Sequence, residues 1–230
     1  MTILASDRPL RALMIAPAFA PALFSEALVN SKLALAMLDA GWDISIYAAP
    51  GSGELYSAGW CDPWSRLQTV RREVPAPGQP RASLVGRMTN MAERLCSALR
   101  TGHPIAGAGW AERTAHAALA EHRSQPFDIV MSRSTSCIAH LPALLIRRTL
   151  GINAPVWIAN WNDPPGHLFP PPYHFPLSRS QCFFKDRYLR AAARSADVNT
   201  FPSAQLRDFL AAPLGLKDDQ IAPSQRGLVV

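Results

Sequence analysis

The chain contains 230 residues, of which 48% are hydrophobic and 17% are charged, a balance that fits an ordinary globular protein and excludes a disordered chain or a coiled coil. Its 21 prolines are about twice the usual share of roughly 5%, so the loops must be many or long. The net charge of +6 comes mainly from arginine and favours anionic partners such as phosphates, nucleic acid or an acidic membrane surface.

The first part of the chain predicts a strand, a loop and a helix. The apolar run Leu10 to Ala16 is typical of a strand buried on both faces. Pro17 and Pro21 argue against reading this region as the helix of a signal peptide. The following helix is predicted to begin with Ser25 as its cap and Glu26 near the positive end of its dipole.

The next signals close a strand-helix-strand unit. Gly41 lies where a left-handed residue ends a helix, and Asp43 to Ala48 predicts the second strand. Since a helix that connects two neighbouring strands in this order leaves them parallel, we expect a parallel sheet.

The middle of the chain has weaker periodicity. Residues 54–80 are predicted to be irregular, with one short strand around Leu67 to Val70. Ser83 to Arg100 has helical spacing, with leucines and methionines on one side and Arg87, Arg94 and Arg100 on the other. Such a helix can lie on an anionic membrane surface, and the alternative is an ordinary core helix with solvated arginines.

The remainder alternates helices and strands again. The predicted elements are helix Trp110 to Arg123, strand Phe127 to Ser132, helix Ser134 to Leu150, strand Val156 to Asn160, helix Gln181 to Arg194, strand Asp197 to Phe201 and helix Ser203 to Leu210. Pro142 is expected to limit or kink the helix Ser134 to Leu150. The order predicts one doubly wound, Rossmann-like α/β domain over residues 1–230, with a mostly parallel sheet, helices on both faces and a site at the carboxyl ends of the strands.

Standard catalytic and metal-binding motifs are missing from the sequence. It has no phosphate-binding G-x-x-x-x-G-K-[ST], no G-x-G-x-x-G, no G-x-S-x-G and no H-E-x-x-H. The four cysteines are far apart, so we expect buried, reduced thiols, and the histidine spacing predicts no metal site. No run of 18 or more apolar residues indicates a membrane span.

Polar side chains follow two of the predicted strands. Arg133, Ser134 and Thr135 come after the strand FDIVMS, and Asn162 and Asp163 come after VWIAN, in a turn that two prolines stiffen. Each has a structural alternative. Asp163 can cap a turn, Arg133 can be a surface cation or pair with a carboxylate, and the hydroxyl side chains can cap a helix.

Five segments in this order carry a resemblance that none carries alone: RALMIAPAFAP, SEALVNSKLALAMLDAGWDISIYAA, FDIVMSRS, PVWIANWNDP and ADVNTFPSAQLRDFL. Together, over Leu10 to Val230, they resemble the N-terminal domain of a GT-B glycosyltransferase of the family 4-like group. Asp163 with Pro164 matches the aspartate-proline turn of that family. Asp197 to Ser203 matches its element of aspartate, hydrophobic strand and serine.

The sequence departs from the family pattern in three places. Many members have a glycine pair after the first strand, whereas residues 18–25 contain no glycine, and many have a histidine at the place of Asn162. A whole GT-B enzyme also has a second domain that binds the nucleotide sugar. The chain ends about where that domain should begin, so we expect it to be incomplete for catalysis alone.

The resemblance implies the acceptor side of a retaining, metal-independent hexosyl transfer, with no cofactor and a nucleotide sugar as the substrate of the complete enzyme. It implies Asp163 as the catalytic residue, and an acceptor site for a sugar, lipid or polysaccharide that comprises Asn162, Arg133, Ser134, Ser25 and His167. The expected location is cytoplasmic, with peripheral association at the inner membrane face, and nucleic acid is not an expected partner. The alternative function is a non-catalytic, membrane-associated binding module that works with a separate donor-domain protein.

Overall fold

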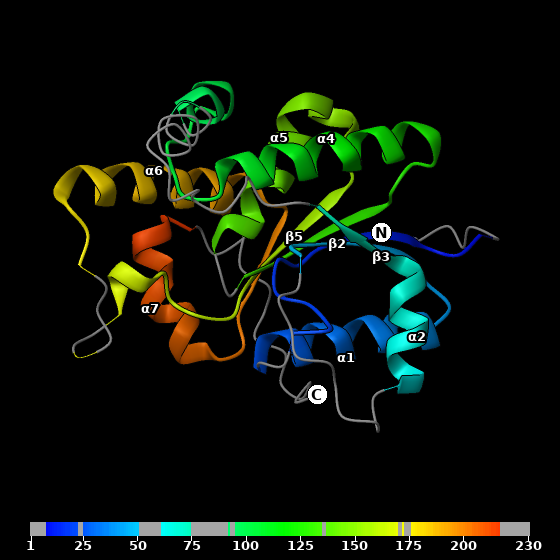
Figure 1. The fold of residues 1–230 in the computed structure, drawn as a ribbon. Helices are drawn as coiled ribbons and strands as arrows, with labels where there is room; N and C mark the ends of the chain where they lie inside the picture. Colours follow the sequence, from blue (N-terminus) through cyan, green and yellow to red (C-terminus); the bar gives the residue numbers. More distant parts are fainter. Residues whose placement is uncertain are drawn as a thin grey trace, which may run out of the picture.

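Within the described residues, six parallel strands form one sheet in the order β3-β2-β1-β4-β5-β6 (Figure 1). The computed structural model describes residues 8–22, 25–50, 61–74, 92, 95–134, 137–169, 172 and 176–216. The strands are β1 (Arg11–Ile15), β2 (Asp43–Ala48), β3 (Arg71–Glu73), β4 (Ile129–Ser134), β5 (Val156–Trp161) and β6 (Val198–Thr200). The main helices are α1 (Ser25–Asp39), α2 (Cys61–Val70), α4 (Ala108–Ser124), α5 (His140–Leu150), α6 (Arg179–Ser195) and α7 (Ala204–Leu214).

The strand order reverses between β1 and β4. From β1 the chain builds β2 and β3 outward on one side, and from β4 it builds β5 and β6 outward on the other. Because parallel crossovers are right-handed, the helices of the two halves must cover opposite faces of the sheet. Figure 1 shows this arrangement, with α1 and α2 on one face and α4, α5 and α6 on the other. The predicted Rossmann-like α/β fold is confirmed.

The alternation of side chains along β1 divides the core into two parts. Ala12 and Met14 pack with the residues of α1, α2 and β2 on one face, and Leu13 and Ile15 pack with those of α4, α5 and α6 on the other. All four side chains are fully buried. The unbroken apolar run of the sequence is therefore explained by a central strand that is covered on both faces.

Two tryptophans of β5 fill the core on the α4 to α6 side, and both have hydrogen-bond partners. Trp157 Nε1 donates to Ser132 Oγ at 2.8 Å, and Trp161 Nε1 donates to Asn199 Oδ1 at 2.8 Å. Residues 157 and 161 are four apart, so a strand presents them on the same face. Burial of these rings is stabilising because their polar N–H groups are not left unsatisfied.

The prediction for residues 54–80, an irregular segment with one strand at Leu67 to Val70, is wrong in part. The structure has helix α2 over Cys61–Val70 and a short edge strand, β3, over Arg71–Glu73. Leu67 is buried while its neighbours at positions 65, 66, 68 and 69 are exposed, which is the pattern of one buried residue on a helical turn. All three residues of β3 are charged, so a search for hydrophobic patterns does not detect this strand. Charged residues are usual on an edge strand.

The helix predicted over Ser134 to Leu150 begins later than expected. The 3₁₀ turn η2 (Cys137–Ala139) comes first, and α5 begins at His140. This start places Pro142 in the first turn of α5, where its missing N–H costs no intrahelical hydrogen bond. Ser134 therefore belongs to β4 and caps no helix, and Thr135 lies outside the described residues.

Several other expectations have a definite outcome. Gly41 ends α1 with a φ of 78°, and Ser203 Oγ accepts a hydrogen bond from the Leu206 N–H at the start of α7, as predicted. The expectation of buried cysteines is wrong for Cys96, which is exposed, while Cys137 and Cys182 are partly buried. Much of the predicted helix Ser83 to Arg100 lies outside the described residues, and residues 95–101 at its end are helical.

No helix among the described residues is long and apolar enough to cross a lipid bilayer.

A buried ion pair holds the amino ends of the strands to α4. Arg11 Nη2 lies 2.6 Å from Glu121 Oε1, and Arg11 Nε lies 2.9 Å from Asp43 Oδ2. Ser45 Oγ and Tyr47 Oη also donate hydrogen bonds to the Glu121 carboxylate. Burial alone raises the pKa of Glu121, but these hydrogen bonds and the Arg11 charge outweigh it and hold that pKa below its usual value.

We predict that Glu121→Gln lowers the free energy of unfolding by about 2 to 4 kcal/mol, because it leaves Arg11 partly uncompensated in a buried site. The matched control is Asp39→Asn, which breaks the exposed Asp39 to Arg66 pair and is expected to cost less than about 1 kcal/mol. Urea unfolding at pH 7 measures both variants. Equal losses in the two variants would show that the Arg11 network is not a major source of stability.

Candidate functional site

Polar side chains from three elements meet at the carboxyl edge of the sheet, where the strand order reverses. Glu26 and Asn30 come from α1, Arg133 from β4, and Asn162 and Asp163 from the segment directly after β5. In doubly wound sheets this edge is the usual place for a ligand, because the two halves diverge there and leave a crevice. We call these five residues the switch-point cluster.

Arg133 extends from the end of β4 toward α1. Its Nε donates a hydrogen bond to Asn30 Oδ1 at 2.7 Å, and Asn30 Nδ2 donates to the carbonyl oxygen of Ala18 at 2.8 Å. Arg133 is only 8% exposed, yet its two terminal nitrogens reach solvent and have no hydrogen-bond or ion-pair partner within the described part of the chain. The guanidinium is thus held on one side and open on the other.

The charge of Arg133 is partly balanced by Glu26. Burial lowers the pKa of the Arg133 guanidinium and the negative charge of Glu26 raises it, and an arginine remains protonated at neutral pH in either case. A held cation with free N–H donors can bind a carboxylate, a phosphate or the hydroxyl oxygens of a polar ligand.

Glu26 connects α1 to the segment after β5. Asn162 Nδ2 donates a hydrogen bond to Glu26 Oε1 at 2.5 Å, and Glu26 is almost completely buried. Burial raises the pKa of Glu26, and the nearby charge of Asp163 adds to this, against the opposing effects of Asn162 and Arg133. A carboxyl group with a raised pKa beside a specific charged partner is a common feature of ligand-binding and catalytic sites.

Asp163 lies between two environments. Its negative charge raises the pKa of Glu26 on one side and that of Cys137 on the other, where burial of the thiol is the larger cause and brings the pKa of Cys137 to about 11. Asp163 itself is exposed and makes no hydrogen bond or ion pair with a described residue. The capping alternative is not supported, since the 3₁₀ turn η4 (Gly166–Leu168) that follows has no side-chain cap.

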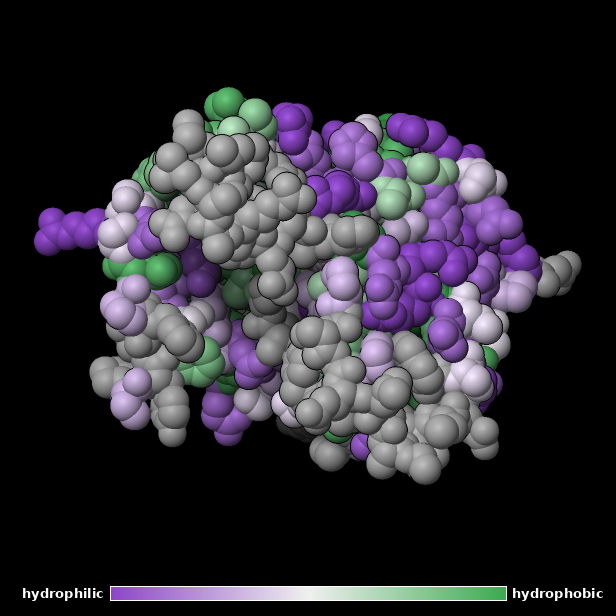
Figure 2. Space-filling model, viewed as in Figure 1, coloured by the Kyte–Doolittle hydropathy of each residue, from purple (hydrophilic) through white to green (hydrophobic). Residues whose placement is uncertain are grey.

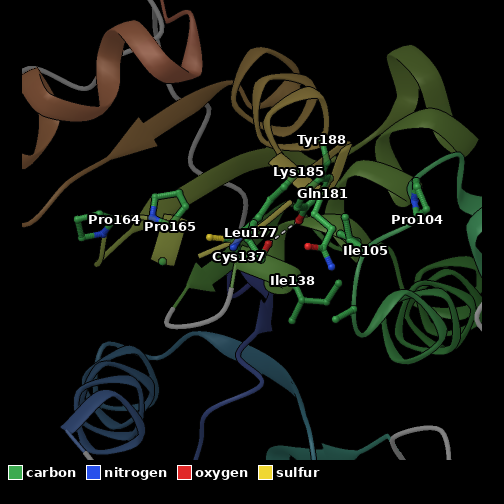
Figure 3. A pocket seen from close by; sticks show the side chains of 12 residues that line it. Pro104, Ile105, Cys137, Ile138, Pro164, Pro165, Leu177, Gln181, Lys185 and Tyr188 are labelled. Carbon is green, nitrogen blue, oxygen red and sulfur yellow. Dashed lines mark hydrogen bonds between the residues drawn. The ribbon is translucent and has the colours of Figure 1, made fainter. Parts of the chain in front are cut away.

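A cavity of about 410 Å³ is lined by Pro164 and Pro165, which follow Asp163 in the chain (Figure 3). Its lining residues come from the segment before α4, from η2, from the turn after β5 and from α6: Pro104, Ile105, Ala106, Cys137, Ile138, Pro164, Pro165, Gly166, Leu177, Gln181, Lys185 and Tyr188. Most of them are apolar. The Tyr188 hydroxyl donates a hydrogen bond to the Cys137 carbonyl oxygen across the back of this cavity, which fixes η2 to α6.

Lys185 gives the cavity one positive charge. No described residue forms an ion pair or hydrogen bond with it, and its charge acts on the Cys137 thiol nearby. Gly107 shapes the same wall, because a Cβ at its φ of 84° would lie 2.9 Å from Ile138 Cγ1. The cavity therefore combines apolar walls with one cation and the amide of Gln181, a combination that fits a ligand with an apolar body and one anionic group.

The remaining residues predicted for the site lie in different surroundings. Ser25 is the exposed first residue of α1, next to Glu26. Ser134 is buried at the end of β4, and its Oγ has no hydrogen-bond partner among the described residues. His167 does not join the switch-point cluster, because its Nε2 lies 2.6 Å from Asp186 Oδ1 of α6 and anchors the turn after β5 to that helix.

Sequence reasoning missed three residues of this edge. For Glu26 the sequence predicts only an interaction with the dipole of α1, and it indicates no role for Asn30 or Lys185. Glu26 and Asn30 are four apart, so they share a face of α1, and this spacing is the one signal that the sequence offers. The position of Lys185 in the cavity depends on the packing of α6 and could not be read from local pattern.

Comparison with known proteins adds no assignment, since no family model matches the chain and no curated protein matches it. Among the described residues, no group of three or more histidine, cysteine, aspartate or glutamate side chains converges in a way that could hold a metal ion.

We predict that the switch-point cluster binds a small oxyanion through Arg133. Sulfate or pyrophosphate should raise the melting temperature of the wild-type chain, and Arg133→Met should weaken this binding about 10- to 100-fold, since charge-assisted hydrogen bonds contribute about 1.5 to 3 kcal/mol. Calorimetric titration measures the affinity. Arg66→Gln, which removes an exposed arginine of α2, is the control and should bind as the wild type does.

We also predict that oxyanion binding strengthens as the pH falls from 7 toward 4.5, which is the ordinary pKa of a glutamate side chain. The raised pKa of Glu26 means that this carboxylate takes up its proton earlier in the titration than a solvated one, which removes a negative charge next to Arg133. Glu26→Gln should bind more tightly at pH 7 and lose most of the pH dependence. A wild-type affinity that is constant over this range would contradict the electrostatic role given to Glu26.

Proposed function

We propose that this chain is the acceptor-binding domain of a nucleotide-sugar-dependent glycosyltransferase with the GT-B architecture, similar to the family 4-like group. The observation that carries the proposal is the convergence of the switch-point cluster beside the 410 Å³ cavity, at the edge of the sheet where that architecture places its acceptor. The resemblance of five sequence segments supports it independently of the geometry.

In this proposal the two sides of Asp163 have different tasks. Arg133, with Glu26 behind it, holds polar or anionic groups of the acceptor, and the apolar cavity with Lys185 holds the rest of the acceptor molecule. Asp163 stands between them with an exposed carboxylate, which can accept a hydrogen bond from the acceptor hydroxyl and orient it for attack. The acceptor class that fits is an amphiphilic molecule with an anionic group, such as a glycolipid or a polyprenyl phosphate derivative.

The other half of the reaction needs groups that stabilise the leaving nucleoside diphosphate. In the family that this chain resembles, most of these groups come from a second domain. We therefore expect the chain alone to bind acceptor and to transfer sugar very slowly or not at all. The resemblance implies a transfer without metal, with the donor phosphate contacts mostly in the second domain.

The test combines this chain with a donor-binding domain, co-expressed or fused, and measures sugar transfer from a panel of labelled nucleotide sugars to a lipid extract. Transfer by the pair, and not by either part alone, is the expected result. Acceptor binding without transfer from any donor in the panel would favour the non-catalytic binding module instead.

Within the active pair, we predict that Asp163→Asn lowers turnover about 100-fold, on the scale that loss of orientation of reacting groups costs. The melting temperature should stay unchanged, since the Asp163 carboxylate has no hydrogen bond to a described residue that the change could break. Asp208→Asn on α7 is the matched control, because that carboxylate is also exposed and lies in a surface pair with Arg207. Unchanged turnover together with a lowered melting temperature would assign Asp163 a structural role.

A further inference from the structure

Helix α6 has a buried side and an exposed side with different chemistry. Tyr188, Leu189, Ala192 and Ala193 are buried in the core. The opposite side, which we call the outer face of α6, carries Phe183, Phe184, Arg187, Arg190 and Arg194. Residues at this spacing lie along one side of a helix, so the aromatic and cationic side chains form a continuous surface.

The two phenylalanines are the most unusual feature of this surface. Phe183 is 61% exposed and Phe184 is 39% exposed, and their rings contact each other edge to face with centroids 5.5 Å apart. Two large apolar rings next to one another in water indicate an interaction surface more often than single exposed residues do. Figure 2 shows hydrophobic and hydrophilic side chains next to one another at the left margin of the molecule, the side where Figure 1 draws α6.

The charge of α6 is strongly positive. The helix contains four arginines and Lys185 against a single acidic residue, Asp186, and the carboxylate of Asp186 is already bonded to His167. Arg187 has no hydrogen bond or ion pair with a described residue, and Arg190 Nε donates only to the Pro213 carbonyl oxygen. No described carboxylate outside α6 forms an ion pair with these two guanidinium groups.

A shallow hollow of about 360 Å³ lies on the same surface. Its described lining residues all belong to α6: Phe183, Asp186, Arg187, Arg190, Ala191 and Arg194. The hollow has an aromatic ring at one end and guanidinium groups along the rest, and both kinds of side chain bind at an anionic membrane surface.

We propose that the outer face of α6 binds the surface of an anionic phospholipid bilayer, with Phe183 and Phe184 inserted at the level of the acyl chains and the arginines at the lipid phosphates. A second copy of the chain is a poorer partner, since two such faces repel each other. Single-stranded nucleic acid also fits cations with aromatic rings, but the edge-to-face contact of the two phenylalanines leaves no pair of parallel ring faces for stacked bases. The proposal does not depend on the transfer of a sugar.

This surface is distinct from the helix predicted over Ser83 to Arg100, for which membrane binding and core packing are both open from the sequence. In that helix the guanidinium of Arg100 pairs with Glu112 of α4. Arg87 and Arg94 lie outside the described residues.

The test measures co-sedimentation of the full chain with vesicles of phosphatidylcholine alone and with vesicles that contain phosphatidylglycerol. We expect binding to the anionic vesicles only. Arg187→Gln with Arg190→Gln should weaken this binding about 25-fold, because each cation near an anionic surface contributes about fivefold. Phe183→Ser should weaken it about tenfold through the loss of apolar burial, and its exposed position makes a folding defect unexpected.

The matched control removes the same kinds of side chain elsewhere, with Ile152→Ser, at an apolar residue that is 99% exposed, and Arg123→Gln on α4. The control should bind anionic vesicles as the wild type does. Equal binding of the wild-type chain to both vesicle types would overturn the proposal, and so would a control that loses as much as the α6 variants. Competition by a single-stranded RNA oligonucleotide at lower concentration than the lipid would assign the face to nucleic acid instead.

Discussion

The arrangement of this molecule depends on one topological constraint, the reversal of strand order between β1 and β4. These strands lie side by side, with Leu13 paired to Val130 in register, but the helices that follow them leave on opposite faces. The segments that follow β1 and β4 therefore diverge at the carboxyl ends of these two strands. At this end of the sheet Arg133 of β4 reaches α1, where its Nε donates a hydrogen bond to Asn30 Oδ1 and its charge interacts with that of Glu26.

The two ends of the sheet have different properties as a result. At the amino ends, Arg11, Asp43 and Glu121 satisfy one another in a closed network, and the guanidinium of Arg11 also lies over the ring of Phe127 at 4.4 Å. At the carboxyl ends, the guanidinium of Arg133 is bonded on one side only, as far as the described residues extend. Both arginines are buried. A buried charge whose hydrogen bonds are completed by neighbouring carboxylates contributes to stability, whereas one with N–H donors left over is a candidate for ligand binding.

How much the sequence predicts depends on the range of the interactions involved. The buried run of β1, the helix end at Gly41 and the position of Asp163 after a strand follow from local pattern and are found in the structure. Helix α2 was missed because Leu67 alone supplies its described buried side, which leaves too little periodicity to detect. Glu26 pairs with Asn162, and His167 pairs with Asp186. Only the fold brings the members of each pair together, so no local sequence pattern predicts either contact.

The most direct test of the candidate site is a map of where an amphiphilic anion binds. Amide chemical shifts of the isotope-labelled chain, recorded during titration with decyl phosphate below its micelle concentration, give this map residue by residue. We expect the largest changes at both sides of Asp163, around Arg133 and Ser134 on β4 and around Gln181 and Lys185 on α6, with little change near Glu121 at the other end of the sheet. Changes confined to the amino edge of the sheet, or an absence of changes around Arg133, would contradict a single ligand site at the switch point.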